Sequence, residues 1–141
     1  MYEPYKWAIY TMDKAYVDLE ALYRMTENET YFVTRAKTPM KYEVVETNYN
    51  INDLVGIVGD KTIRFTGYAS RKKYPKDLRI VEFYDAEKEE VIIFLTNNFE
   101  LGPLVIANIY RNRWQIESFF YDKHIIMQSS VARMHANGLA L

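Results

Sequence analysis

The chain has 141 residues and a formal net charge of −1, with 49% hydrophobic and 26% charged residues. These values fit a single domain with one hydrophobic core and exclude an overall basic field. Cysteine is absent, which excludes disulfides, thiolate zinc sites and cysteine nucleophiles. The start MYEPYKWAIY does not resemble a signal peptide, and no apolar run is long enough to span a membrane. We therefore expect a cytoplasmic protein without a membrane partner.

The first part of the chain, residues 1–39, predicts a strand, a helix and a second strand. The apolar run WAIYTM at 7–12 indicates a buried strand. An amphipathic helix follows and ends near 27–30, because one helical face collects apolar side chains, namely Val17, Ala21, Leu22 and Met25. The run YFVTRAK at 31–37 indicates the second strand. This order is typical of a parallel α/β unit.

Residues 40–97 predict consecutive strands. Four runs are rich in Val, Ile, Phe and Tyr: KYEVVET, KTIRFTGY, LRIVEFYD and EVIIFLTN. Turn-forming residues separate them, namely Gly56, Gly59, Asp60 and the pair Tyr74-Pro75. Short links between strands imply an antiparallel meander, which we interpret as a β insertion. From 98 to 127 the period becomes helical, with Gly102 and Pro103 suited to the helix start, and 128–141 is a divergent tail of weak periodicity.

Asp13 follows the apolar strand at 7–12, where ligand sites of parallel sheets gather. A carboxylate there could hold Mg²⁺, which prefers carboxylate and water oxygens. It could equally be the N-cap of the next helix, since aspartate is a preferred cap. The position alone leaves both readings open.

Tyr110, Arg113 and Glu117 lie three and four residues apart and share one stripe of the predicted helix. The same spacing also describes an ordinary Arg–Glu pair beside an aromatic side chain.

Two groups of basic residues also allow either a functional or a structural interpretation. Arg35 and Lys37 alternate outward from a strand, and the run 61–79 has seven basic residues and one acidic residue, including Arg71, Lys72 and Lys73. Such residues contact a nucleic-acid backbone or form a solvated surface.

Three segments taken in order resemble a known family: IYTMDKAYVDLEALYRM, YFVTRAK and FLTNNFELGPLVIANIYRNRWQIESFF. They resemble the C-terminal part of the catalytic domain of insertion-sequence DDE transposases, in the IS-four family with the signature Y-x2-R-x3-E-x6-K. The resemblance covers nearly the whole chain. It implies an α/β fold, a partial ribonuclease-H-like core interrupted by an antiparallel β insertion. It also implies DNA cleavage and strand transfer by three carboxylates and two divalent metals, Mg²⁺ or Mn²⁺.

The resemblance assigns roles to individual residues. Asp13 matches the second catalytic aspartate and Glu117 the catalytic glutamate, and both would bind metal. Tyr110 and Arg113 match the signature residues that contact DNA, and Arg35, assisted by Lys37, resembles a further DNA contact. The signature lysine falls at His124, with Lys123 one residue earlier, and a one-residue shift on a helix rotates a side chain by ~100°. Both stay candidate phosphate contacts, and Ala15 replaces a glycine of the aspartate motif.

The first catalytic aspartate of the family would lie upstream of residue 1. We therefore expect an inactive, transposase-derived chain, 1–141, as a single truncated catalytic domain. The alternatives are a non-catalytic module that binds DNA or a full-length transposase, and a chain that assembles with a separate partner supplying the aspartate. The strand at 7–12 would then present an open apolar edge, and such edges seek partners. We expect a homodimer or larger assembly through this edge.

Overall fold

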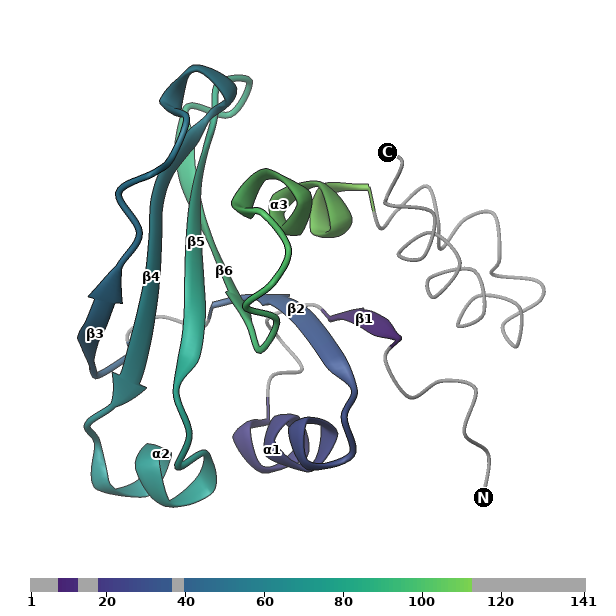
Figure 1. Ribbon diagram of the computed structural model, residues 1–141, viewed down its shortest axis with the longest axis vertical. Helices are drawn as coiled ribbons and strands as arrows, with labels where there is room; N and C mark the ends of the chain where they lie inside the picture. Colours follow the sequence, from purple (N-terminus) through teal and green to yellow (C-terminus); the bar gives the residue numbers. More distant parts are fainter. Residues whose placement is uncertain (1–7, 13–17, 37–39, 113–141) are drawn as a thin grey trace.

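The computed structural model describes residues 8–12, 18–36 and 40–112, which form one six-stranded sheet with helices packed against it (Figure 1). The strand order is β1-β2-β6-β5-β4-β3. Only β1 and β2 pair in parallel, and every other neighbouring pair within the described residues is antiparallel. The elements in chain order are β1 (Ile9–Met12), α1 (Leu19–Glu27), β2 (Tyr31–Arg35), β3 (Tyr42–Thr47), the 3-10 helix η2 (Asp53–Val55), β4 (Ile57–Phe65), α2 (Tyr68–Lys73), β5 (Leu78–Asp85), β6 (Glu90–Thr96) and α3 (Pro103–Arg111).

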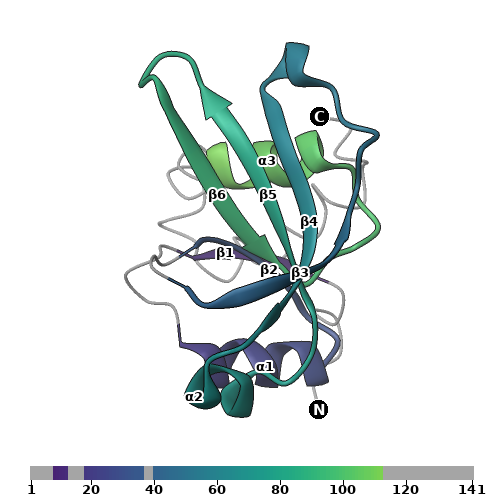
Figure 2. The same ribbon diagram turned by 90° about the vertical axis from the view of Figure 1, so that its left-hand side faces the viewer.

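The sheet separates two hydrophobic cores, because successive side chains of a strand point to opposite faces. Val33 of β2 belongs to the core that also contains Ile106 and Ile109 of α3. Its neighbour Phe32 belongs to the other core, with Leu22 of α1. Figures 1 and 2 show α1 and α2 side by side at one end of the sheet, apart from α3. The parallel pair is therefore covered on both faces, as parallel strands generally are.

The predicted strand, helix and strand at the start of the chain are confirmed, including the parallel pairing of β1 with β2. The helix begins at Leu19, later than its apolar pattern suggested, because Asp18 is its N-cap. The Asp18 carboxylate accepts hydrogen bonds from the backbone N–H groups of Glu20, at 3.0 Å, and Ala21, at 3.4 Å. Two of the N–H groups that a helix start leaves unpaired are satisfied in this way.

The antiparallel meander is also confirmed, and it continues the same sheet because β6 pairs with β2. The prediction of a turn at Gly59 and Asp60 was wrong, since both residues lie inside β4, with Gly59 next to a register shift. A Cβ atom at Gly59 would lie 1.8 Å from Oε1 of Glu82, so the strand has room only for glycine while Glu82 keeps its position. Gly56 does turn the chain, with a φ of 96°, at the end of η2.

The segment between β4 and β5 contains the short helix α2, which the sequence did not predict. The helix is followed by Tyr74, whose ring is buried and lies edge-on to the ring of Tyr23 on α1, with centroids 5.4 Å apart. The Tyr74 hydroxyl shares a 2.7 Å hydrogen bond with the hydroxyl of Thr26, and burial raises the pKa of Tyr74 to about 12. Packing of Tyr74 against α1 thus fixes α2 in place.

Candidate functional site

The carboxyl ends of β1 and β2 lie together at one edge of the sheet, since Met12 pairs with Thr34 in the parallel ladder. The buried Thr34 hydroxyl donates a 2.8 Å hydrogen bond to the carbonyl oxygen of Met12. Met12 immediately precedes Asp13 in the chain, and Thr34 immediately precedes Arg35. Asp13 itself lies outside the described residues. The structure therefore shows how the backbone that leads to Asp13 is held.

The second reading of Asp13, as the N-cap of the following helix, is wrong, because Asp18 occupies that position. The cap is a local requirement, and the aspartate directly before the helix meets it. Asp13 is therefore not needed to start α1.

Arg35 and Tyr110 come from distant parts of the sequence and lie on the same face of the sheet. Arg35 ends β2 and stands opposite Phe94 of β6 in the antiparallel register. Directly opposed residues project on the same side of a sheet. The ring of Tyr110, on α3, is tilted by 45° against the ring of Phe94, with centroids 5.1 Å apart. Phe94 is thus the common neighbour of two residues that the sequence singled out as DNA contacts.

The two residues differ in exposure. Arg35 is half-buried, whereas Tyr110 is 8% exposed and belongs to the core beneath α3. Burial of the Tyr110 ring gives it a packing role in addition to any contact its hydroxyl makes. The assignment of Tyr110 as a DNA contact stays a prediction.

Sequence reasoning missed Arg111, the last residue of α3. Its guanidinium lies 4.4 Å from the ring centroid of Phe83 and donates to the side-chain oxygen of Asn108 at 3.3 Å. A cation over an aromatic face is attracted by the ring quadrupole. No local sequence signal pairs Arg111 with Phe83, because the two residues meet only when α3 packs on β5.

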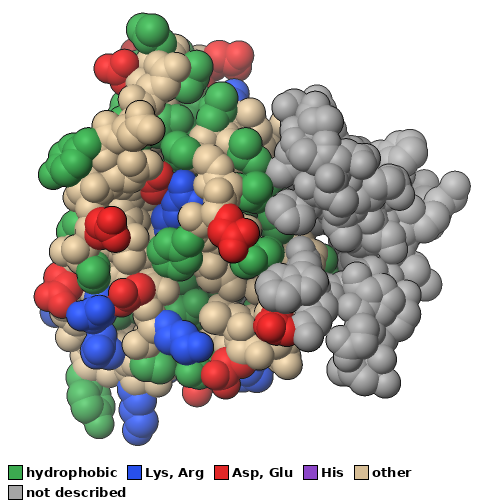
Figure 3. Space-filling model, viewed as in Figure 1, with side chains coloured by type: hydrophobic (Ala, Val, Ile, Leu, Met, Phe, Trp, Pro, Cys, Tyr) green, Lys and Arg blue, Asp and Glu red, His purple; other side chains and the backbone are tan. Residues whose placement is uncertain are grey.

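The basic run at 61–79 contains two groups of three residues in the structure, and its seventh basic residue, Lys76, lies 5.9 Å from the ring centroid of Tyr23. Arg71, Lys72 and Lys73 form the exposed last turn of α2, which has no acidic residue in its first turn. The other group consists of basic side chains paired with carboxylates: Lys61 with Glu82, Arg64 with Asp77, and the buried Arg79 with Asp60. Figure 3 shows acidic and basic side chains interspersed on the face of the molecule that is turned to the viewer in Figure 1. Only part of the run is therefore open to a nucleic-acid backbone.

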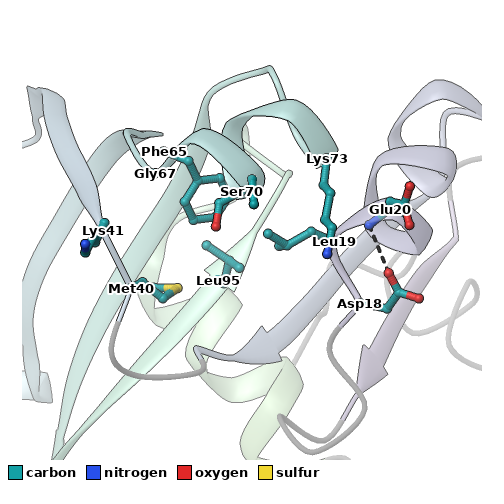
Figure 4. Close-up of a pocket in the computed structure, with 11 residues that line it drawn as sticks. Asp18, Leu19, Glu20, Met40, Lys41, Phe65, Gly67, Ser70, Lys73 and Leu95 are labelled. Carbon is teal, nitrogen blue, oxygen red and sulfur yellow. Dashed lines mark hydrogen bonds between the residues drawn. The ribbon is translucent and has the colours of Figure 1, made fainter.

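A hollow of about 630 Å³ lies between the start of α1 and α2 (Figure 4). Lys73 extends from α2 toward Leu19, beside the capping bond between Asp18 and Glu20. Leu95 and Phe65 form part of its apolar lining. Acidic and basic side chains both line the hollow, so its charge does not select one class of ligand.

The remaining candidates, namely Lys37, Arg113, Glu117, Lys123 and His124, lie outside the described residues. Within residues 8–12, 18–36 and 40–112, no three His, Asp or Glu side chains gather in a way that could hold a metal ion. The carboxylates of Asp13 and Glu117 are nevertheless the kind of oxygen donor that Mg²⁺ prefers. In the same described ranges, no helix is long and apolar enough to cross a membrane.

A family profile and two related proteins assign this chain to the same family. A profile of the family described as "Transposase DDE domain" matches residues 1–129. The protein named "Putative transposase y4zB", from Sinorhizobium fredii, is 30% identical over 116 residues, which are 80% of this chain and 32% of that protein. The protein named "Probable transposase for insertion sequence element IS5377", from Geobacillus stearothermophilus, is 30% identical over 110 residues, 77% of this chain and 28% of that protein.

This chain therefore spans about a third of the length of these two relatives. No solved structure matches it significantly. The family profile covers far more than half of the chain, and both relatives agree with it. On these grounds the chain belongs to the transposase DDE domain family.

Proposed function

We propose that this chain forms part of a two-metal transposase site, to which it contributes Asp13 as the second aspartate and Glu117 as the glutamate. The main observation that supports this proposal is that the carboxyl ends of β1 and β2 lie side by side. Arg35, at the end of β2, lies on the face of the sheet that α3 covers. In this proposal the sheet is part of a ribonuclease-H-like core. Its Tyr110, Arg113 and Glu117 are the signature residues of the IS-four group.

The two carboxylates would hold Mg²⁺ or Mn²⁺ through their oxygens, and Arg35, Arg113 and Tyr110 would bind the phosphates of DNA near the metals. Divalent ions at such a site activate the attacking oxygen and stabilise the leaving oxygen. In this proposal the carboxylates of the chain bind the metal ions, and its basic residues orient the DNA phosphates. Lys37, Lys123 and His124 are proposed as further phosphate contacts.

Metal binding tests the assignment of Asp13. We expect Asp13→Asn to weaken Mn²⁺ binding by about tenfold, the loss of one ligand corresponding to about 1.4 kcal/mol. Binding is measured from the electron paramagnetic resonance signal of free Mn²⁺. Asp18→Asn is the matched control, because it removes the same charge and asparagine still caps α1. Equal weakening in both variants, or none in Asp13→Asn, would contradict the assignment.

We propose further that the isolated chain does not cleave DNA, because only two of the three carboxylates of the two-metal scheme are assigned to its residues. Incubation of labelled duplex DNA with the chain and Mn²⁺ tests this statement. Cleavage that the Asp13→Ala variant abolishes would overturn it.

The second candidate function is non-catalytic binding of DNA, which the exposed basic end of α2 favours. Arg71, Lys72 and Lys73 project there without an acidic neighbour inside the helix, and Tyr68 is 83% exposed. Lysine and arginine side chains bind phosphates by displacing counterions, and exposed aromatic rings stack on bases. In this reading α2 contacts the DNA backbone whether or not the metal site is complete.

Fluorescence anisotropy of duplex DNA at low salt tests the second function. Lys72→Glu is expected to weaken binding and to reduce its salt dependence, as loss of a phosphate contact does. Lys88→Glu is the control, since Lys88 is also exposed but lies in the turn at the opposite end of β5 (Figure 1). The same weakening in both variants would indicate a general charge effect and would reject α2 as the contact.

A further inference from the structure

The loop between β6 and α3, residues 97–102, is held by polar contacts at both of its ends. The Asn97 side chain accepts a hydrogen bond from the Phe32 N–H at 2.9 Å and donates to the Thr30 carbonyl at 3.0 Å. The Asn98 side-chain oxygen accepts from the N–H groups of Glu100 and Leu101, both at 2.9 Å. The loop is thereby joined to β2 and folded on itself immediately before α3 begins.

Arg79 of β5 reaches the same loop from the antiparallel part of the sheet. Its Nη1 donates to the carbonyl oxygens of Asn98 at 3.0 Å and Leu101 at 2.7 Å. Its Nε and Nη2 donate to the two carboxylate oxygens of Asp60 on β4, at 2.8 and 2.9 Å. Asn48 donates to the same carboxylate at 2.9 Å. The guanidinium thus joins β4 and β5 to the loop through four directed hydrogen bonds.

This ion pair is buried, with 7% of the Arg79 side chain and 5% of the Asp60 side chain exposed. Buried ion pairs are seldom more stabilising than apolar side chains of the same volume, because both charges lose their hydration. An apolar pair could fill this space, but it could not bind the carbonyl groups of Asn98 and Leu101. The ion pair therefore contributes directed hydrogen bonds to the loop, which an apolar pair would lack.

We propose that Arg79, oriented by Asp60, is a positioning residue that fixes the start of α3. α3 carries Tyr110, and the sequence continues from α3 to Arg113 and Glu117, so Arg79 holds the described element that precedes the proposed glutamate. The inference rests on the proposed function only in the role given to Glu117. The contact between Arg79 and the loop is independent of that role.

A second ion pair of β4 provides a matched control. Arg64 also binds a carboxylate through two nitrogens, donating to Asp77 at 2.9 and 3.3 Å. This pair is half-buried, with 40% of the Arg64 side chain and 33% of the Asp77 side chain exposed, and none of its described contacts reaches the loop. Replacement of either pair removes the same chemical groups, but only the Asp60–Arg79 pair touches residues 97–102.

Amide hydrogen exchange tests the positioning directly. We compare the wild-type chain with two double variants, Asp60→Leu/Arg79→Met and Arg64→Met/Asp77→Leu. In the first, exchange at the N–H groups of Glu100, Leu101 and Ile106 is expected to rise by about tenfold, because these groups become more open locally. The N–H of Thr66, bonded to the Lys41 carbonyl in another loop, is expected to stay unchanged. The second double variant leaves all four groups unchanged.

Unfolding in urea, measured on the same samples, separates positioning from overall stability. A rise at Thr66 equal to that at Leu101 would mean general destabilisation and would overturn the inference, as would unchanged exchange in the first variant. If Asp60→Leu/Arg79→Met does not fold, the single variant Arg79→Lys replaces it in the exchange experiment. It keeps the charge but loses the planar fork, so faster exchange confined to the loop is expected.

Mn²⁺ affinity, measured on fully folded samples, tests whether the loop influences the proposed metal site. We expect affinity to fall by about fivefold in Asp60→Leu/Arg79→Met and to stay constant in the Arg64 control. Unchanged Mn²⁺ affinity in a variant whose loop exchanges faster would reject an influence of the loop on the proposed metal site. A wild-type chain that binds no Mn²⁺ would reject the proposed metal site instead, while the exchange data would still decide whether Arg79 fixes the loop.

Discussion

The hydroxyl of Thr34 donates a 2.8 Å hydrogen bond to the carbonyl oxygen of Met12, joining the last paired residues of the two parallel strands. Thr34 is fully buried, so water does not replace this donor. The bond holds the peptide group that connects Met12 to Asp13. The strand end is therefore fixed by a side chain as well as by the ladder.

Thr34→Val should lower the free energy of unfolding by about 1 kcal/mol, because the Met12 carbonyl loses its donor at a partly buried site. It should also weaken Mn²⁺ binding if Asp13 is a ligand. Urea unfolding and Mn²⁺ titration measure the two effects. Thr34→Ser keeps the hydroxyl and is expected to retain Mn²⁺ affinity, so equal loss of that affinity in both variants would argue against the hydrogen bond as the cause.

Asp18→Ala should destabilise the fold by about 1 kcal/mol, because two N–H groups at the start of α1 lose their acceptor. Asp18→Asn should retain most of this stability, since asparagine caps equally well. Asp13→Asn should leave the stability of α1 unchanged, because Asp13 is not the cap. Thermal unfolding followed by circular dichroism distinguishes the three variants, and a similar loss in Asp13→Asn would contradict the assignment of the cap.

Stability should fall as the pH rises from about 10 to about 12, because burial raises the pKa of Tyr74 from its ordinary 10.0 to about 12. The fold binds the Tyr74 proton more tightly than the unfolded chain does. Its contribution is therefore complete below pH 10 and is lost as the pH passes the folded value. Burial also raises the pKa of Tyr23 and Tyr31, so the decline has several sources.

Tyr74→Phe removes the titrating hydroxyl and should make the alkaline decline shallower. The variant also loses the hydrogen bond to Thr26, so its stability at neutral pH should be lower than that of the wild type. Urea unfolding at a series of pH values measures both effects. A decline as steep as that of the wild type would show that Tyr74 is not a main source.

The two outer strands of the described sheet differ in a way that bears on assembly. β1 reads IYTM and carries no charge, whereas β3 reads YEVVET and has two glutamates and a register shift between Val44 and Glu46. Charges and bulges protect an edge from pairing with another chain. We therefore predict that any homodimer or contact with a full-length transposase uses β1.

Light scattering over a range of concentrations tests this prediction. Thr11→Lys should lower the average mass toward that of the monomer, because a charge at the edge opposes pairing. Val44→Lys, at the opposite edge, should leave the mass unchanged. A wild-type chain that is monomeric at every concentration would reject assembly through β1.

Local sequence patterns predicted much of the fold because they report local requirements. Alternating and continuous apolar runs marked the strands, and the Gly102-Pro103 pair marked the start of α3, where proline needs no N–H partner. The same local logic mistook Gly59 for a turn. Whether a glycine turns a chain or admits a neighbouring side chain depends on the opposite strand, here on Glu82.

For the candidate site, the sequence by itself determined which residue types were present and their order: a carboxylate after a strand, an arginine after the next strand, and the signature residues from Tyr110 onward. The helix predicted over 98–127 begins at Pro103 and is described as far as Arg111, so its continuation through Arg113 and Glu117 stays a prediction. Only the tertiary structure decided the surroundings of the described residues. It assigned the cap of α1 to Asp18, placed Arg35 and Tyr110 around Phe94, and buried Arg79 against Asp60. Asp60 and Arg79 are 19 residues apart. Their pairing arises from strand register and the shared cost of burying charge, which no local pattern records.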